Sequence, residues 1–335
     1  MKIDCFTHVM PQAYADALQQ EVGGYGELAK LHKAMPALFD MDLRIASMDR
    51  LGIDQQVITL AAPPVEVVAK DPELAAKLAA IANDGIAEMA DRDPGRFIPV
   101  GNIAMNNMSV AVAETRRCIE QLGMKGMLIY SSDRRRAIDT DRFMPFYDLM
   151  ADYDLPIWIH PAREPDVPDY IDEDVSEYVI WQVFGWPYET TAAMTRLVFS
   201  GVFDRHPDIK FITHHAGAMA PFFDKRIESV YPLFTSANPK LREQVESMDE
   251  PVLNYFKKFY GDTALMGSVG GLTNALAFFG SDHLLFGTDA PFDLQGGDQF
   301  TVDTVTSIEA LPASDKAKQE IYSENLRRML RLDSR

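Results

Sequence analysis

The sequence contains little that would place the protein in a membrane, on nucleic acid or outside the cell. Its two cysteines, Cys5 and Cys118, are too few for a disulfide framework, which indicates a reducing compartment, and we expect a cytoplasmic protein. No apolar run approaches the roughly 20 residues of a membrane-spanning helix, and the N-terminus lacks the pattern of a signal peptide. The chain has 32 Lys and Arg against 50 Asp and Glu, a net charge of -18, which argues against a nucleic-acid partner because phosphates need a basic face.

The rest of the composition is that of an ordinary globular protein. Hydrophobic residues make up 47% of the chain and charged residues 24%. No shift of composition and no low-complexity segment marks a domain boundary in the 335 residues, and barrels of alternating strands and helices often use this length as one domain. We therefore expect a single domain over residues 1–335.

Short apolar runs alternate with segments of helical period along the chain. The predicted strands are residues 2–8, 53–60, 97–104, 124–130, 155–160, 208–215, 256–263 and 284–289. The predicted helices are residues 42–51, 72–93, 109–122, 142–153, 188–203, 272–279 and 314–332, the last with Ser314 as its N-cap. This order predicts an α/β fold, a single (β/α)8 barrel of the TIM type. We expect a small insertion after strand 1, at residues 12–40, and a long loop after strand 5, at residues 162–186, which forms a lid or pocket wall.

Four of the predicted strands end in a potential metal ligand, namely His8, His160, His215 and Asp289. In a barrel of this kind the loops at the C-terminal ends of the strands build the active site, so these side chains are expected to converge. Imidazole nitrogen and carboxylate oxygen are ligands that a divalent cation such as zinc prefers. One histidine at a strand end is more often an ordinary hydrogen-bonded residue, but four such coincidences at one end of a barrel favour a site.

The other histidines are expected to have ordinary roles. His214 precedes His215, and neighbouring side chains of an extended strand face opposite sides, so only one of the pair is expected inside the site. His32, His206 and His283 lie in predicted loops or at strand starts, where we expect them to be solvated.

Several motifs, in this order and spacing, resemble one family. They are DLRIASMDRLGIDQQV at residues 42–57, IHP at 159–161, GWPYETT at 185–191, the turn from His215 through Pro221 to Ile227, and FGTDAPF at 286–292. Together they resemble the amidohydrolase-related decarboxylases, a group that includes aminocarboxymuconate semialdehyde decarboxylase and the resorcylate and carboxyvanillate decarboxylases. The resemblance runs through nearly the whole chain.

The resemblance implies a metal site and a proton carrier. By comparison with the family, His8, His160 and Asp289 bind one divalent metal, with zinc as the first choice and Mn2+ or Mg2+ as alternatives. His215 stands six positions before Pro221 and matches the proton-shuttling histidine, so it is expected to be catalytic together with Asp289. His214 is then the outward-facing neighbour.

The resemblance also implies how a small carboxylated substrate is bound. Arg44 and Arg226 match two arginines that hold the substrate carboxylate, and a planar guanidinium suits a bidentate contact. In the family the arginine that matches Arg226 reaches across from a partner subunit, which predicts a homodimer. Trp181 and Trp186 are expected to cover the flat face of the substrate.

The first strand departs from the family pattern. His-x-His or Glu-x-His is usual there, whereas this chain has Phe6, Thr7 and His8, so a ring that cannot coordinate a metal replaces one ligand. Three protein ligands and a water still make a working zinc site, although the loss of a ligand weakens metal binding. We expect Phe6 to line the substrate pocket or to leave a coordination position to water.

Three functions follow from these residues. The first is a metal-dependent, non-oxidative decarboxylase of a small aromatic or unsaturated carboxylic acid. The second is a metal-dependent hydrolase of an amide, ester or lactone, or a hydratase, on the same scaffold. The third, which Phe6 keeps open, is a catalytically inactive binding protein.

Overall fold

Parallel strands that follow one another in chain order form the centre of the computed structural model, which describes residues 1–332. The strands are β1 (Ile3–Val9), β2 (Gln55–Leu60), β3 (Phe97–Pro99), β4 (Gly101–Asn102), β5 (Met127–Tyr130), β6 (Ile157–His160), β7 (Phe211–Thr213), β8 (Tyr260–Asp262) and β9 (Leu284–Leu285). All their pairings are parallel. Parallel strands are usually covered on both faces, which explains why these runs are mostly apolar and almost completely buried.

Hydrogen bonds join the two ends of this series into a barrel. β3 and β4 are two parts of one strand, because Val100 N between them donates to Ile58 O of β2 (3.1 Å) while Gly101 N donates to Gly126 O before β5 (3.1 Å). On the other side, β1 pairs with the segment that starts at β9, since Cys5 N donates to Phe286 O (2.7 Å). Counting β3 and β4 as one, the nine assigned strands make the eight of the predicted barrel, and that prediction is confirmed.

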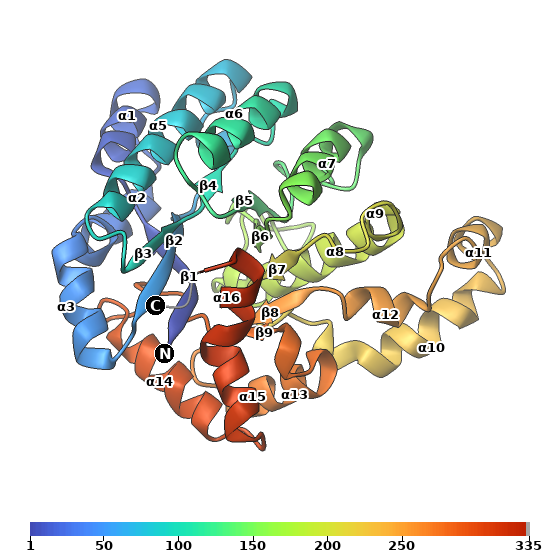
Figure 1. The fold of residues 1–335 in the computed structure, drawn as a ribbon. Helices are drawn as coiled ribbons and strands as arrows, with labels where there is room; N and C mark the ends of the chain where they lie inside the picture. Colours follow the sequence, from blue (N-terminus) through green and yellow to red (C-terminus); the bar gives the residue numbers. More distant parts are fainter. Residues whose placement is uncertain (333–335) are drawn as a thin grey trace.

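Helices surround the strands (Figure 1). The main ones are α3 (Met41–Leu51), α5 (Pro72–Asp91), α6 (Met108–Glu120), α7 (Met144–Tyr153), α8 (Trp186–Phe199), α13 (Val269–Phe279) and α14 (Asp298–Glu309). The ring closes where Ser47 and Arg50 of α3 both donate to Asp298 at the start of α14. Asp40 and Asp71 cap α3 and α5 by accepting from the first helical N–H groups, which would otherwise lack partners.

The predicted insertion after the first strand is helical. It consists of α1 (Gln12–Val22), α2 (Glu27–Lys33) and a 3-10 turn at Pro36–Leu38. The insertion packs closely on α5 at one glycine: a Cβ on Gly85 would lie 2.4 Å from Cβ of Pro11, so a larger residue would push α1 away from the barrel.

Other boundaries differ from the prediction. The structure adds α10 (Asp224–Thr235), α11 (Pro239–Glu246) and α12 (Val252–Phe256) after β7, α14 after β9 and the short helix α4 (Val65–Val68). The predicted helix at residues 188–203 is divided into α8 and α9 (Val202–Arg205). None of the residues of α10 is fully buried, and Pro232 stands inside it, a residue that normally ends a helical pattern. The last predicted helix is divided into α15 (Asp315–Gln319) and α16 (Asn325–Leu330) by one π-helical turn, and Ser314 caps it as predicted.

The long loop after strand 5 is largely irregular until it enters a π-helical turn at Trp181–Gly185, which runs into α8. Its place after β6 and before α8 agrees with the prediction. None of the helices in the described part of the chain is both long and apolar enough to cross a bilayer. The predicted domain extends to residue 335, and its last three residues, 333–335, lie outside the described part.

A buried carboxyl group ties β1 to the loop after β9. Asp4 accepts hydrogen bonds from the backbone N (3.1 Å) and the hydroxyl (2.6 Å) of Thr288. Burial raises the pKa of Asp4 from 3.8 to about 7, because it outweighs the hydrogen bonds of Thr288 and Phe6 and the charge of Arg44. The folded chain therefore retains a proton that the unfolded chain has lost, and stability falls as the pH rises through this window.

We expect the variant Asp4→Asn to remove this pH dependence. When the pH is raised from 5.5 to 7, the wild type should lose roughly 2 kcal/mol of unfolding free energy relative to the variant. Denaturant titrations at several pH values measure it, with Asp91→Asn, at an exposed position, as the matched control. A difference that stays constant with pH would contradict the raised pKa.

Candidate active site

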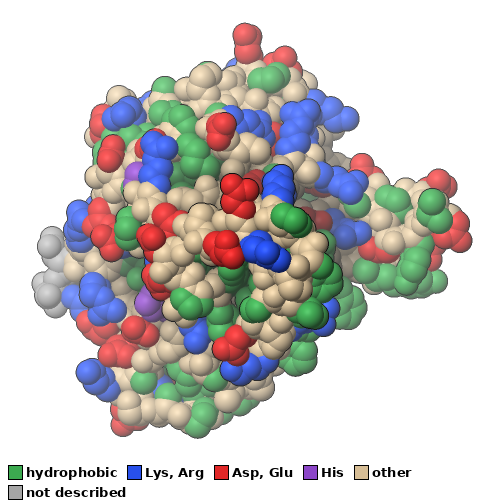
Figure 2. All heavy atoms as spheres, turned by 90° about the vertical axis from the view of Figure 1, so that its right-hand side faces the viewer, with side chains coloured by type: hydrophobic (Ala, Val, Ile, Leu, Met, Phe, Trp, Pro, Cys, Tyr) green, Lys and Arg blue, Asp and Glu red, His purple; other side chains and the backbone are tan. Residues whose placement is uncertain are grey.

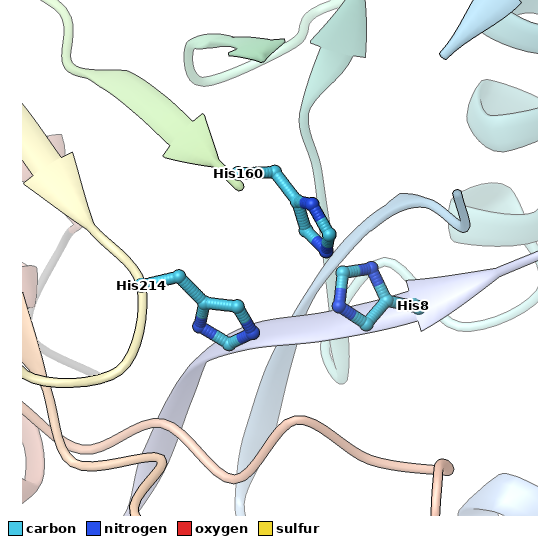
Figure 3. Close-up of side chains that lie close together, drawn as sticks. All are labelled: His8, His160 and His214. Atoms are coloured by element: carbon cyan, nitrogen blue, oxygen red, sulfur yellow. The ribbon is translucent and has the colours of Figure 1, made fainter. Parts of the chain in front are cut away.

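Three imidazoles meet at the C-terminal ends of the strands. His8 lies near the end of β1, His160 ends β6 and His214 follows β7, and one ring nitrogen of each lies within 4.8 Å of the others. Figure 3 shows the three rings pointing toward one another from separate strands. All three residues are buried. We call them the three-histidine cluster.

Hydrogen bonds decide which nitrogen of His8 faces the cluster. The Thr59 hydroxyl donates to Thr7 O (2.9 Å), so it accepts from His8 Nδ1, which lies 3.0 Å away. The proton of the neutral ring is therefore on Nδ1. Nε2 of His8 is left with its lone pair, on the side where Asp289 lies.

The other two imidazoles are held in the same way. His160 Nδ1 donates to Pro161 O (2.7 Å), and His214 Nδ1 donates to the Asp262 carboxylate. Each ring thus uses Nδ1 for a structural partner and turns Nε2 toward the cluster. Metal-bound histidines show this arrangement, in which the second ring nitrogen donates to a carbonyl or carboxylate and fixes the ring.

Asp289 adds a carboxylate to these nitrogens. Its Oδ1 lies 3.1 Å from Nε2 of both His8 and His214. Burial by itself would raise the pKa of Asp289, but the charge of His214 and the hydrogen bonds of His214 and His215 hold it well below its usual range. The carboxylate is therefore ionised and needs a cation next to it.

The charges of the site favour a cation between these groups. Burial lowers the pKa of His8, and lowers that of His160 still further, so both are neutral. Burial also acts to lower the pKa of His214, but Asp262 and Asp289 outweigh it and raise that pKa to about 10. A proton on Nε2 of His214 and a divalent metal compete for the same lone pair. Two sets of donors lie close enough together for one ion, namely His8, His160 and His214, and His214, His215 and Asp289. Imidazole nitrogen and carboxylate oxygen fit such a metal.

His215 lies beside His214 rather than on the opposite side. β7 ends at Thr213, and His215 has a left-handed φ of 56°, so the two residues belong to a turn and strand alternation does not apply to them. Their rings are 4.0 Å apart, and His215 Nε2 lies 3.8 Å from Asp289 Oδ2. The prediction that His214 faces outward is wrong. The catalytic role of His215 stays a prediction.

Phe6 lies under the three-histidine cluster. Its ring is fully buried, 4.0 Å from the ring of His214 and 5.4 Å from that of His8, measured between centroids. It therefore supports the imidazoles by packing. That Phe6 also lines the substrate pocket stays a prediction.

Arg44 is buried with its guanidinium directed at β1. It donates to Thr7 Oγ1 (3.2 Å), Gln56 Oε1 (3.1 Å), Ala37 O (3.1 Å) and the backbone oxygen of His8. A bidentate contact with a substrate carboxylate, as predicted, would require Arg44 to give up at least one of these bonds. The observed contacts make it a residue that positions His8.

The other predicted substrate residues lie in different surroundings. Arg226 is exposed on α10. The ring of Trp186 lies edge-on to His160 with centroids 5.3 Å apart, and Trp181 lies 5.5 Å from Trp186 in the same manner. Trp186 Nε1 donates to Arg163 O (3.2 Å), which fixes that indole at the edge of the cluster.

Sequence reasoning missed several residues of the site. Asp262 ends β8 and Tyr130 ends β5, so the strand-end argument that selected His160 would also have selected them. Phe292, with its ring 5.3 Å from that of His8, follows the last predicted strand. His214 was assigned away from the site by strand alternation.

His32 is a further correction. It was expected in solvent, but it is fully buried on α2, where the Tyr25 hydroxyl lies 3.0 Å from its Nδ1. Its ring packs 5.6 Å from that of Phe292, which brings the insertion against the site. The error arose because the helix α2 that buries His32 has too few apolar residues to be recognised.

Comparisons of the sequence with known proteins agree with this geometry. The sequence model of the family described as amidohydrolase matches residues 3–332. Gamma-resorcylate decarboxylase of a Polaromonas species is 31% identical over 260 residues, which cover 75% of this chain and 77% of that protein. The 2-amino-3-carboxymuconate-6-semialdehyde decarboxylase of Dictyostelium discoideum is 29% identical over 353 residues, which cover 99% of this chain and 92% of that protein.

A solved structure shows the same fold. It is the crystal structure of a dihydroxybenzoic acid decarboxylase from a Polaromonas species with bound manganese and the inhibitor 2-nitroresorcinol. Its TM-score is 0.81 at 25% sequence identity, and the match covers 100% of this chain and 98% of that chain. The likeness therefore includes every strand that carries the three-histidine cluster and Asp289.

Proposed function

Since this chain belongs to the amidohydrolase family, we propose that it is a carboxy-lyase, a metal-dependent decarboxylase of a small aromatic or unsaturated carboxylic acid. The observation that carries the proposal is the convergence of three imidazole Nε2 atoms and the Asp289 carboxylate beside two indole rings. A shared fold alone does not establish a reaction. The activities of the related proteins therefore support the proposal only in combination with this site.

The residues that would hold the metal are His8, His160 and Asp289, with His214 as the additional ligand that compensates for Phe6. Zinc suits imidazole and carboxylate ligands, and manganese is the alternative because it is bound in the related dihydroxybenzoic acid decarboxylase. When bound, a divalent metal supplies Lewis acidity toward an oxygen of the substrate.

His215 is proposed to deliver the proton. Its side chain is 13% exposed, its Nε2 faces Asp289, and its Nδ1 has no hydrogen-bond partner among the described residues. Protonation of the carbon that bears the carboxylate interrupts the conjugation of the substrate. The bond to the carboxylate then breaks, its electron pair returns to the conjugated system, and carbon dioxide leaves.

The indoles and one arginine are proposed to bind the substrate. Trp186 and Trp181 provide apolar surface for a flat ring next to His160. The guanidinium of Arg44 already donates to Thr7 and Gln56, so we assign it a positioning role. We assign the contact with the substrate carboxylate to Arg226 of the partner subunit.

This assignment requires a homodimer, and the surface around α10 supports one. Phe222, Leu233 and Phe234 are 75%, 65% and 57% exposed, respectively. Figure 2 looks onto the side of the molecule where α10 and α11 lie in Figure 1, and hydrophobic side chains are visible at its surface among charged ones. Exposed apolar side chains grouped in this way are typical of subunit interfaces.

We expect Phe234→Glu to separate the subunits. Sedimentation equilibrium should give twice 37.6 kDa for the wild type and 37.6 kDa for the variant. The kcat/KM of the variant should fall by about 10- to 100-fold, because Arg226 no longer reaches the site. This factor corresponds to the free energy of one hydrogen bond to a charged group. Val110→Glu, at a position 44% exposed on α6, is the matched control and should remain dimeric. A monomeric wild type would contradict the proposal.

Measuring the products tests the function itself. Protein loaded with zinc or with manganese is offered a panel of hydroxybenzoates and unsaturated acids, and release of carbon dioxide is expected, with loss on chelation and recovery when metal is returned. Amides, esters and lactones in the same panel cover the alternative reactions. Hydrolysis without carbon dioxide release, or no turnover by metal-loaded protein, would overturn the proposal.

We also propose that residues 1–335 form one domain and that the protein works in the cytoplasm. Support for the compartment comes from Cys5 and Cys118, which are both buried and unpaired.

A further inference from the structure

The long loop between β6 and α8 leads into both indoles of the proposed substrate site, but it has almost no core of its own. Between residues 163 and 184, all of which the structure describes, Ser176 is the only residue that is buried. Large apolar side chains of this segment, among them Tyr170, Ile171 and Tyr178, are exposed. Ordering such a segment costs conformational entropy, which burial of apolar surface usually offsets. Polar contacts therefore have to keep this loop in one conformation.

Asp169 is at the centre of those contacts. Its Oδ1 accepts from Nη2 of Arg163 (2.6 Å), and its Oδ2 accepts from the hydroxyl of Ser176 (2.5 Å). The side chains of Arg163 and Asp169 are only 15% and 13% exposed. Hydrogen bonds that involve a charged group are stronger than those between neutral groups. Asp169 thus joins the start of the loop to its middle.

Ser176 continues the path to the first indole. Its hydroxyl donates its one proton to Asp169, so the same oxygen is free to accept from Trp181 N (2.9 Å). Trp181 begins the π-helical turn, and an N–H group at the start of a helix has no partner within it. We call the side chains of Arg163, Asp169 and Ser176 the loop network.

Arg163 also holds the second indole. Its backbone oxygen accepts from Trp186 Nε1 (3.2 Å), and its side chain packs against the turn between the two indoles, where a Cβ on Gly185 would lie 2.6 Å from Cδ of Arg163. Arg163 is three residues beyond His160, whose ring is 5.3 Å from that of Trp186. The residue is therefore tied to one indole directly and to the other through the loop network.

We propose that Asp169 and Ser176 are positioning residues, which hold Trp181 and Trp186 beside His160 and so set the affinity for a flat substrate. They act through Arg163 and the backbone of Trp181, without touching the substrate. An indole that is already fixed does not have to be ordered when the substrate arrives, which favours binding. The proposal rests on the proposed function, because the substrate of that reaction is the molecule that the indoles cover.

Tryptophan fluorescence tests the positions of the indoles without any turnover. The chain has three tryptophans and Trp158 is fully buried, so quenching by acrylamide reports on Trp181 and Trp186. We expect Ser176→Ala and Asp169→Asn each to raise the quenching constant about twofold, and the double variant to raise it little further, because both residues belong to one network. Asp172→Asn, the same chemical change as Asp169→Asn at an exposed position of the same loop, is the matched control and should be quenched like the wild type.

Steady-state kinetics test the consequence for the substrate. On an acid that the metal-loaded wild type decarboxylates, Ser176→Ala and Asp169→Asn should raise KM about tenfold and leave kcat within about twofold, the signature of lost binding that is equal in the ground state and the transition state. The metal content and the melting temperature should not change, because the loop lies outside the barrel core and neither side chain bonds a residue of the three-histidine cluster. Unchanged melting also distinguishes a displaced loop from an unfolded barrel.

Two results would overturn the proposal. One is quenching in Ser176→Ala and Asp169→Asn that equals that of Asp172→Asn. The other is increased quenching with an unaltered KM, which would show that the indoles move without any effect on the substrate.

The same measurements separate this proposal from the proposed function. If the wild type releases no carbon dioxide while both variants are quenched more strongly, the decarboxylase function fails and the positioning of the indoles stands. If carbon dioxide is released and wild type and variants share the same KM, the positioning role fails and the decarboxylase function stands.

Discussion

Substitution of His215 by alanine is expected to lower kcat for decarboxylation by about a thousandfold, since a positioned acid or base contributes roughly 10²–10⁴ to a rate. The metal content should not change. His215 Nε2 lies 3.8 Å from Asp289 Oδ2, and its Nδ1 has no partner in the described part of the chain, so its removal deletes a proton carrier and leaves the cluster intact. Turnover and metal content are measured on the same preparation.

His214→Ala is the informative comparison, because the two residues are neighbours with rings 4.0 Å apart. His214 Nε2 faces His8 and His160, so this variant should lose metal as well as activity. The reverse outcome, in which His215→Ala loses metal and His214→Ala retains it, would exchange the two roles. Retained activity in His215→Ala would remove that residue from the mechanism.

Asp289→Asn is expected to weaken metal binding by about 10²- to 10⁴-fold, because removing one partner from a buried charged group costs roughly 3–5 kcal/mol. Asp289 Oδ1 lies 3.1 Å from Nε2 of both His8 and His214, and its ionised carboxylate is the charge that balances a cation there. An amide keeps the shape and loses the charge. Metal titration monitored by calorimetry gives the affinity, and kcat is measured at saturating metal.

Asp262→Asn provides a graded control for this prediction. Asp262 is fully buried and accepts from Nδ1 of His214 and from Ala216 N, so it acts on the metal indirectly, through that ring and the turn that carries it. Loss of such a supporting partner typically costs about 10- to 100-fold in affinity or activity. A larger loss in Asp262→Asn than in Asp289→Asn would show that Asp289 is not a ligand.

The predictable part of the site follows from the architecture. His8, His160 and Asp289 were found because each closes an apolar run, and parallel barrel strands deliver their C-terminal ends to one place. That inference needs only the order of the strands and helices along the chain and the burial of the apolar runs. The helices α10 and α11 were not predicted, because Pro232 lies inside α10, where proline normally ends a helical pattern, and neither helix has a fully buried residue.

The identity of the inward-facing histidine after β7 could not be predicted in this way. Alternation requires an extended backbone, whereas His215 and Ala216 have φ angles of 56° and 55°. A turn of this kind depends on the contacts that enclose it, including the hydrogen bond from Ala216 N to Asp262 Oδ1 (3.0 Å), which comes from the next strand. Arg44 is a similar case, because its partners Thr7 and Gln56 lie on two different strands.

The sequence by itself determined the class of fold, the end of the barrel that holds the site and most of its potential ligands, because these depend on local periodicity and on the order of elements. Only the tertiary structure decided which nitrogen of each imidazole faces the cluster and that His214 lies inside it. The physical reason is that hydrogen bonds and desolvation depend on contacts between residues far apart in the chain, such as His8 and Asp289, and no local pattern records them.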